Sequence, residues 1–414
     1  MMHSTPDPSP KPEVSITRKP VSIPGAEAVG PGRCAAFQAQ TSYTSLQGNG
    51  LIQDYNQWIG SDVAGAHFMR TSGDNGRSWS IPTKEFDPQP DERGGFQRRG
   101  ESTFFLSLKT GLLYRFFNLH YYARAHFTSD IWWNNRIMMQ CSRDAGKNFG
   151  RAEALTTCDA GPGEWARGIA IGKSALAISF SRPFSRSDGA IIVPVQQVPP
   201  LRSEQDPVLR WRAACLVGIE QEGGIEWRLS QAVALEPEKS VRGIFEPAIV
   251  ELKGGRLLMV ARGSNTRAPE MKGYKWRSHS DDGGFHWSPA VPLALSDGTP
   301  LYSPSSGSAL LRQSGGKVYW VGNLCDENPD GNRPRFPLWI AELDEVTLTL
   351  RKESLMMIDH RTMSDSPWLQ LSNFRVYEDR ETAEIVVHLA RVEEQAKGDF
   401  SVPLTEYRIA LCSP

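Results

Sequence analysis

The sequence of 414 residues predicts an all-β fold, a β-propeller of six blades. Three observations lead to this prediction. A short motif recurs at a regular step, the segments around it have the composition of β-strands, and no stretch shows the apolar spacing of a long amphipathic helix. Seven blades are the alternative count.

The recurring motif has the pattern S-x-D-x-G-x-x-W. It is complete at residues 72–79 and 280–287, and residues 142–149 carry Phe in place of Trp. Weaker copies begin at Glu220 and Glu342, so the successive starts lie 70, 78, 60 and 62 residues apart. Matches at so regular a step are typical of a repeat protein in which each repeat is one structural unit.

The polar residues of the motif are expected to build a turn. Ser and Asp side chains bond nearby backbone N–H groups, and Gly tolerates a positive φ. The aromatic residue is expected to pack between neighbouring blades. We therefore interpret Asp74, Asp144 and Asp282 as structural residues rather than catalytic ones.

The segments before the motifs are predicted to be strands. Alternating or apolar runs occupy residues 136–142, 214–220 and 337–343, and their composition favours half-buried strands. Residues 254–262 and 315–323 each open with Gly-Gly and are expected to be the returning strands of hairpins. A repeat of this length holds about four strands and their loops, which is one propeller blade.

The sixth blade is expected to combine both ends of the chain. Five marked repeats leave the residues before about 60 and after about 355, and residues 383–392 and 404–412 have the composition of strands. Pairing them with an N-terminal strand would remove the free sheet edges. Residues 1–24 are Pro-rich and polar and are predicted to be a disordered tail, which leaves residues 25–414 as a single propeller domain.

Charge and cysteine spacing exclude several classes of function. A net charge of -1 argues against a nucleic-acid partner, and six cysteines without a C-x-x-C pair argue against a zinc ribbon. No apolar run is long enough to span a membrane. We expect no cofactor and no metal. The N-terminal residues lack the apolar region of a secretion signal, so a cytoplasmic protein is the default expectation. A secreted or periplasmic protein whose signal had been removed would look the same, and the sequence leaves the oligomeric state open.

The repeated motif and several local segments resemble the sialidase (neuraminidase) superfamily, over about residues 30–410. Residues 245–263 are similar to the family segment in which a Glu begins one strand and an Arg ends the next. Further segments with local similarity are residues 189–197, 303–312 and 331–343. The resemblance implies a glycoside hydrolase of exo-sialidase type that acts on terminal acidic sugars of glycans, with its site on the propeller axis.

The resemblance also implies a set of site residues. Sialidases hold the substrate carboxylate with three arginines and use a Tyr nucleophile paired with a Glu, and an Asp as acid/base. Arg33, Arg262 and Arg335 match the three arginines, with Arg333 as an alternative to the third. Glu246 matches the family Glu, and Asp62 lies where the acid/base Asp is expected, with Asp54 as the alternative.

The family nucleophile is the point of departure. Leu371 stands at the position of the Tyr, and Tyr377 lies six residues later. Leu offers no nucleophilic group, so the usual sialidase reaction requires another residue in this role.

Residues 118–135 have no counterpart in the family and are rich in aromatic residues and His. His120 and Tyr121 are candidates for proton transfer, because these residue types exchange protons in active sites. A uronate-directed polysaccharide lyase, or a non-sialic glycosidase that uses His, Tyr and Arg, is therefore the first alternative function. A propeller that binds glycans without cleaving them is the second, and a plain aromatic strand pair is the structural alternative for this segment. In each functional case the partner is an acidic oligosaccharide or polysaccharide.

Overall fold

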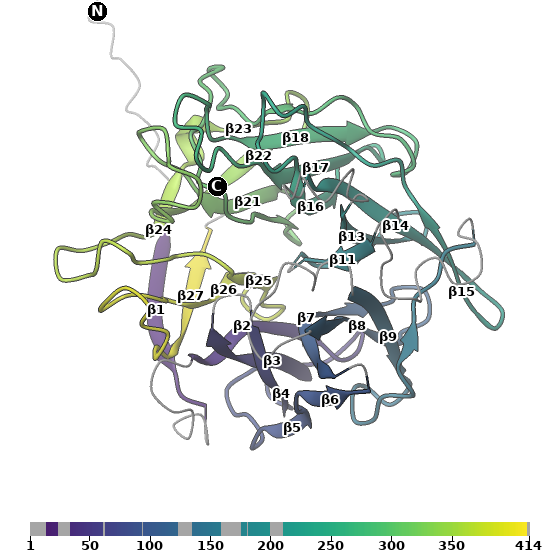
Figure 1. Cartoon of the computed structure of the whole chain (residues 1–414). Coiled ribbons are helices and arrows are strands. Elements are labelled where there is room, and N and C mark those ends of the chain that lie inside the picture. The colour runs from purple at the N-terminus through teal and green to yellow at the C-terminus, as the bar shows by residue number, and fades with distance from the viewer. Residues whose placement is uncertain are drawn as a thin grey trace, which may run out of the picture.

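The computed structural model describes residues 14–23, 34–60, 63–92, 94–122, 135–158, 175–179, 181–198 and 210–411. These residues form strands and one short 3-10 helix, η3 (Lys352–Ser354). The strands make six antiparallel sheets arranged around a common centre (Figure 1). The predicted all-β fold and the count of six blades are therefore confirmed, and the alternative count of seven is wrong.

Each blade is one sheet, and its strands lie side by side in order from the centre of the propeller outward. Blade 1 contains β2 (Cys34–Tyr43), β3 (Leu51–Gly60), β4 (Val63–Ser72) and β5 (Thr83–Phe86). Blade 2 contains β6 (Gln89–Asp91), β7 (Gly95–Leu106), β8 (Leu113–Tyr122), β9 (Asn135–Ser142) and β10 (Glu153–Ala154). Blade 3 contains β11 (Ala175–Ile178), β12 (Phe184–Ser185), β13 (Ile191–Val198), β14 (Arg212–Gln221) and β15 (Gly224–Leu229).

The remaining blades follow in chain order. Blade 4 contains β16 (Phe245–Glu251), β17 (Leu257–Arg262), β18 (Lys275–Ser280) and β19 (Val291–Pro292). Blade 5 contains β20 (Ala309–Arg312), β21 (Val318–Asn323), β22 (Leu338–Asp344), β23 (Thr349–Leu350) and β24 (Met356–Asp359). Blade 6 contains β25 (Arg375–Glu378), β26 (Ile385–Ala390), β27 (Leu404–Ala410) and β1 (Ser15–Val21).

The hydrophobic core is divided among the interfaces between blades. One cluster joins Ile192 and Cys215 of blade 3 to Met259 of blade 4, and similar clusters lie between blades 2 and 3, 4 and 5, and 5 and 6. The second strands β17, β21 and β26 are buried at every residue because both of their faces pack on neighbouring blades. The predicted strand segments lie in β9, β14, β17, β21 and β22.

The recurring motif joins the third strand of a blade to the fourth. The Ser280 hydroxyl donates to the Asp282 carboxylate and accepts from the Gly284 N–H, and the Asp282 carboxylate accepts from the His286 N–H, at 2.8, 2.9 and 2.9 Å. Trp287 packs against the core between blades 3 and 4. The same bonds recur in the motifs that begin at residues 72 and 142, as expected for a turn-forming motif.

Asp282→Ala is expected to lower the midpoint of thermal unfolding by a few degrees, because it removes several hydrogen bonds of the turn. Burial alone would raise the pKa of Asp282, but bonds from His286 and Ser280 lower it to about 2. The stabilisation is therefore present above pH about 4 and is lost as the pH falls toward about 2. Asp281→Ala is the matched control, since this neighbouring carboxylate is exposed and pairs only with surface groups. Equal midpoints for the two variants at neutral pH would contradict the structural role.

The propeller ring is closed in blade 6. β1 pairs with β27 over its whole length, from Ser15 opposite Ala410 to Val21 opposite Leu404. The predicted closure by an N-terminal strand is confirmed, but residues 34–60 form strands of blade 1 rather than of the sixth blade. The predicted tail of residues 1–24 is wrong for residues 15–21, which form the closing strand. This segment has a polar composition that does not predict a strand. Its backbone hydrogen-bond partners lie in β27, far away in the sequence, so no local pattern indicates the pairing.

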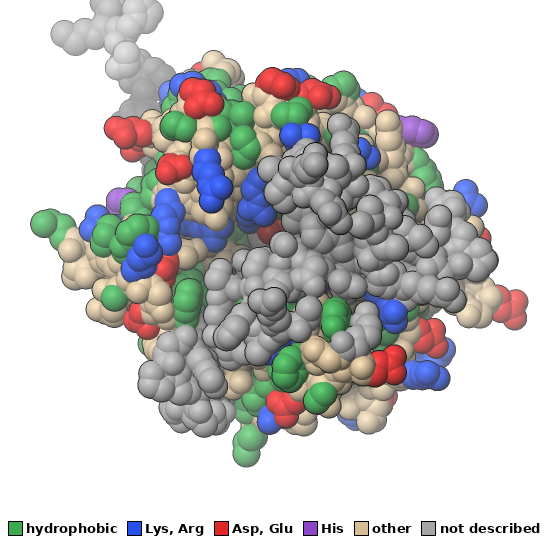
Figure 2. All heavy atoms as spheres, viewed as in Figure 1, with side chains coloured by type: hydrophobic (Ala, Val, Ile, Leu, Met, Phe, Trp, Pro, Cys, Tyr) green, Lys and Arg blue, Asp and Glu red, His purple; other side chains and the backbone are tan. Residues whose placement is uncertain are grey.

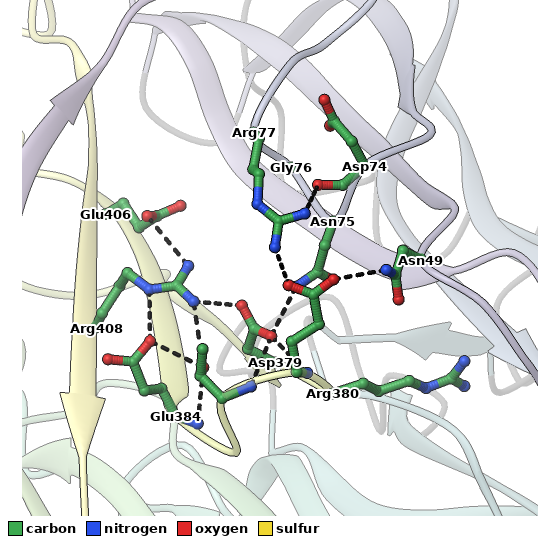
Figure 3. Close-up of polar contacts among 12 residues, drawn as sticks. Asn49, Asp74, Asn75, Gly76, Arg77, Asp379, Arg380, Glu384, Glu406 and Arg408 are labelled. Atoms are coloured by element: carbon green, nitrogen blue, oxygen red, sulfur yellow. Dashed lines mark hydrogen bonds and ion pairs between the residues drawn. The ribbon is translucent and has the colours of Figure 1, made fainter.

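A polar network joins blade 1 to blade 6 (Figure 3). Asn75, in the first motif, donates to Asp379 at 2.7 Å and accepts from the Tyr43 hydroxyl at 2.8 Å. Arg77 pairs with Glu381, which also accepts from the Asn49 amide at 2.6 Å. Asn75 adopts a positive φ of 59°, which Asn tolerates better than most residues. This turn therefore fastens the first blade to the last.

Candidate active site

A cavity of about 290 Å³ lies where the inner ends of the blades meet, and all six blades contribute to its wall. The described residues that line it are mainly polar and aromatic. They are Phe37, Gln38, Asn56, Trp58, Val63, Ala64, Gly100, Glu101, His120, Tyr122, Ser179, Gln196, Trp211, Arg242, Phe245, Glu246, Arg262, Asn332, Arg333, Arg335, Gln370, Asn373 and Phe400. Figure 2 shows Lys and Arg side chains gathered near the centre of this face.

Three inner strands are irregular where they reach the cavity. In β7 the residues Gly100 and Glu101 lie opposite a single residue of β8, and in β16 Glu246 and the next residue do the same against β17. β2 is irregular around Gln38. Such bulges redirect a side chain at the edge of a site. Gln38 and Glu246 also have positive φ values of 55° and 50°, a backbone strain that is common at functional sites.

Glu246 and Arg262 form an ion pair inside the cavity. The Arg262 guanidinium donates to the Glu246 carboxylate at 2.6 Å, and both side chains are largely buried. Arg262 also lies 4.3 Å above the Phe245 ring, which stacks on Trp211. The Gln196 side chain lies 3.3 Å from the Glu246 N–H and accepts from it. The orientation of the Arg262 guanidinium is therefore fixed by the Glu246 carboxylate, by the Phe245 ring and by the pairing of β16 with β17.

Arg335 and Arg333 approach from the loop before β22. Arg335 donates to the Gln370 side chain at 2.8 Å and to the Ser305 carbonyl at 3.0 Å. Arg333 pairs with the buried carboxylate of Glu393 at 3.0 Å and stacks over a tryptophan ring. Arg333 thus has a carboxylate partner within the protein, whereas Arg335 donates to the neutral Gln370 side chain and the Ser305 carbonyl.

A second acidic group, Glu101, lies in blade 2. Its carboxylate accepts from the Asn118 amide at 2.8 Å and lies 3.5 Å from Nε2 of His120. Burial alone would raise the pKa of Glu101, but His120 and Asn118 lower it to about 2. Glu101 is therefore ionised at neutral pH.

Two buried cations lie behind the lining residues and were not identified from the sequence. Arg375 opens β25, and burial lowers its pKa to about 9, which Glu101 and Glu246 partly counteract. Lys275 of β18 lies opposite Arg262 of β17 in the strand register and donates to the Pro304 carbonyl at 3.1 Å. Burial also lowers the pKa of Lys275 well below its usual value. A basic residue at the first position of a strand was the available signal.

The structure brings together four of the seven residues predicted for the site. Glu246, Arg262, Arg335 and His120 all line the cavity. Tyr121 is not among the described lining residues, because alternate residues of β8 face opposite sides and Tyr122 shares the side of His120. Asp62 and Arg33 lie outside the described residues.

The alternative residues for the acid and the nucleophile lie elsewhere. Asp54 is buried in an ion pair with Arg115. Leu371 is fully buried in the core between blades 5 and 6. Tyr377 lines a separate groove near the closure network rather than this cavity. Tyr122 is therefore the one tyrosine among the described lining residues.

The lining determines the kind of ligand that fits. Arginine forks bind carboxylate or phosphate groups through paired hydrogen bonds. The aromatic wall of Phe37, Trp58 and Phe400, with successive ring centroids 3.9 and 4.8 Å apart, offers an apolar surface. No group of three or more potential metal ligands occurs among the described residues, and none of their helices could cross a bilayer. The cavity suits an anionic ring compound such as a carboxylated sugar.

Comparison with known proteins agrees with this fold. Residues 118–356 match the family described as BNR repeat-like domain. No curated protein matches the chain in sequence. The chain is similar in structure to a protein of unknown function from Dyadobacter fermentans, with a TM-score of 0.62, 12% identity, and coverage of 96% of this chain and 99% of that one.

Two enzymes of known type are also similar in structure. The intramolecular trans-sialidase from Ruminococcus gnavus has a TM-score of 0.56 and 14% identity, covering 90% of this chain and 95% of that one. The α-L-arabinanase from Penicillium chrysogenum has a TM-score of 0.52 and 13% identity, covering 90% and 92%. At these identities the similarity establishes the shared propeller fold.

Proposed function

Because the chain belongs to the family of BNR repeat-like domains, we propose that it is a glycosidase that releases a terminal carboxylated sugar from a glycan, in the manner of an exo-sialidase. The observation that carries the proposal is the meeting of Glu246, Arg262 and Arg335 in one axial cavity. The two arginines would bind the sugar carboxylate, and Glu246 would act at the reacting carbon. Arg33 and Asp62 keep their proposed roles as a further carboxylate ligand and as the acid/base.

A second candidate function is elimination from a uronic-acid polysaccharide. The burial of Leu371 in the core favours it, because no nucleophile then stands at the sialidase position. The pair of His120 and Glu101 in the cavity offers a base for removal of the proton next to a uronate carboxylate. The same arginines would neutralise that carboxylate in either reaction.

The deciding experiment gives the purified protein two kinds of substrate in parallel. One is a fluorogenic sialoside, and the other is a panel of uronic-acid polysaccharides followed by the ultraviolet absorbance of a new carbon–carbon double bond. Release of the fluorophore would support the proposed hydrolase. New ultraviolet absorbance would instead support the lyase and contradict the hydrolase. Binding without turnover of any substrate would contradict both reactions and leave a glycan-binding propeller.

Arg335→Ala is expected to raise KM for the anionic substrate about 10- to 100-fold, which corresponds to the loss of a hydrogen bond to a charged group. Arg333→Ala should have a clearly smaller effect, because Arg333 is already paired with Glu393. Steady-state kinetics of the two variants measure this difference directly. A larger effect at Arg333 would reverse the assignment of the third arginine.

A further inference from the structure

We propose that Glu101 is a second catalytic carboxylate of this site and that His120 is its positioning residue. This inference rests on the proposed cleavage of an anionic glycan and adds to it the group that takes a proton from the attacking water. Neither residue type nor spacing marked Glu101 in the sequence, since it lies within a strand that contains other charged residues.

The backbone of β7 directs Glu101 into the cavity. The register of β7 and β8 shifts between Arg99 and Ser102, so Gly100 and Glu101 face one residue of the partner strand. A Cβ atom at Gly100 would lie 2.4 Å from Nε2 of His120. The imidazole therefore packs directly on the glycine, and this close packing brings it to the carboxylate of the next residue.

Hydrogen bonds behind the cavity fix the orientation of the carboxylate. The Asn118 amide donates to Glu101 at 2.8 Å and also to the Ile178 carbonyl at 2.8 Å. The Asn118 carbonyl oxygen accepts from the Ile178 N–H at 3.0 Å and from the Asn135 amide at 3.1 Å. The amide cannot turn over without losing these bonds, so it always presents N–H to Glu101. Such support from behind is typical of residues that must hold a precise position.

The groups around Glu101 keep its carboxylate ionised. His120 from β8 faces its carboxylate, and Arg375 from β25 interacts with it electrostatically. Asn118 is the neutral donor of the same set. These groups stabilise the ionised form, which is the form that a general base needs.

The proposed step is a hydrolysis in which all atoms are accounted for. The Glu101 carboxylate takes one proton from a water molecule while the water oxygen bonds to the anomeric carbon. The glycosidic C–O bond breaks and its electron pair stays on the departing oxygen. Asp62, which keeps the acid part of its proposed role, gives that oxygen a proton and regains one from solvent. Glu101 then returns its proton to solvent. Glu246 lines the same cavity and supplies the second negative charge near the cationic transition state.

The test uses the full-length protein and the substrate that the wild type cleaves. Glu101→Gln is expected to lower kcat/KM about 100-fold, and formate should restore part of the activity of Glu101→Ala. His120→Gln should shift the acidic limb of the pH profile of kcat/KM upward by about one pH unit, since it removes the main group that lowers the pKa of Glu101. Glu92→Gln, at an exposed carboxylate just before the same strand, is the matched control.

The outcomes separate this inference from the proposed function. If the Glu246→Gln variant is inactive but the Glu101→Gln variant has near wild-type activity, the role of Glu101 is overturned and the proposed function stands. If formate does not restore activity to Glu101→Ala and the acidic limb of the kcat/KM profile of His120→Gln is not shifted, both residues have only a structural role. This result would also overturn the inference. Absence of turnover by the wild type would overturn the proposed function and this inference with it.

Discussion

Replacing Glu246 with glutamine is expected to lower kcat/KM by about 10²- to 10⁴-fold while leaving the fold intact. Glutamine keeps the size of the side chain and its bond to Arg262, but it removes the negative charge and the proton acceptor. The backbone at this residue is held in the left-handed region by the bulge in β16 and the bond to Gln196, so the substitution has little freedom to relax. The measurement is the rate of sugar release by the variant and the wild type at equal concentration.

Glu251→Gln is the control for this variant, because Glu251 ends the same strand at the protein surface, where its carboxylate accepts from the N–H and hydroxyl of Ser187. Its activity should equal that of the wild type. An active Glu246→Gln protein with an unchanged melting temperature would contradict the proposed site. An inactive protein that is also unfolded would require Glu246→Asp, which keeps the charge, to separate charge from folding.

Removing the carboxylate of Asp54 is expected to cost about 3–5 kcal/mol of unfolding free energy. The Asp54 and Arg115 side chains are 2% and 1% exposed, so the pair has no contact with water that could replace it. His67 lies 3.4 Å from the other oxygen, and the Ser102 hydroxyl also donates to the carboxylate at 3.3 Å. Asp54→Ala would therefore leave a buried guanidinium whose remaining acidic partner among the described residues is the half-buried Glu85, at 3.5 Å.

The same pair makes stability depend on pH. Burial alone would raise the pKa of Asp54, but Arg115 and His67 hold it well below its usual value. The stabilisation is therefore complete above pH about 4 and is lost as the pH falls further. Denaturant unfolding at neutral and acidic pH measures both effects, with Asp87→Ala, at an exposed surface pair, as the control. A wild-type-like midpoint for Asp54→Ala would show that the pair adds nothing to stability.

The architecture was predictable because it depends on features that repeat. Each turn motif uses local hydrogen bonds from Ser, Asp and Gly, so its residues and spacing are visible in the sequence. The regular spacing remains recognisable even in the weaker copies. The apolar second strands of the blades are similarly local. The strand at residues 15–21 was missed because its partner, β27, is nearly the whole chain away, and its own composition is polar.

The site was predictable where it sits on a regular strand pair. Glu246 and Arg262 begin and end adjacent strands, and this pattern is readable along residues 245–263. Glu101 and Arg375 were not recognised because their meeting depends on a bulge and on the packing of separate blades. Tyr122 in place of Tyr121 shows a further limit: a group of aromatic residues is visible in sequence, but the side that each one faces depends on the strand's register.

The pairing of β1 with β27 also has a consequence for synthesis of the protein. Blades 1 to 5 each draw their strands from one continuous stretch, so each can assemble soon after it leaves the ribosome. Blade 6 cannot, because β1 must wait for its partner β27, which is synthesised after the strands of blades 1 to 5. During that interval β1 has no partner strand, and the contacts of Asn75 with Asp379 form only when the ring of blades closes. A chain whose synthesis stops before β27 would thus have five complete blades. Blade 6 would be incomplete, and the axial cavity would be open on that side.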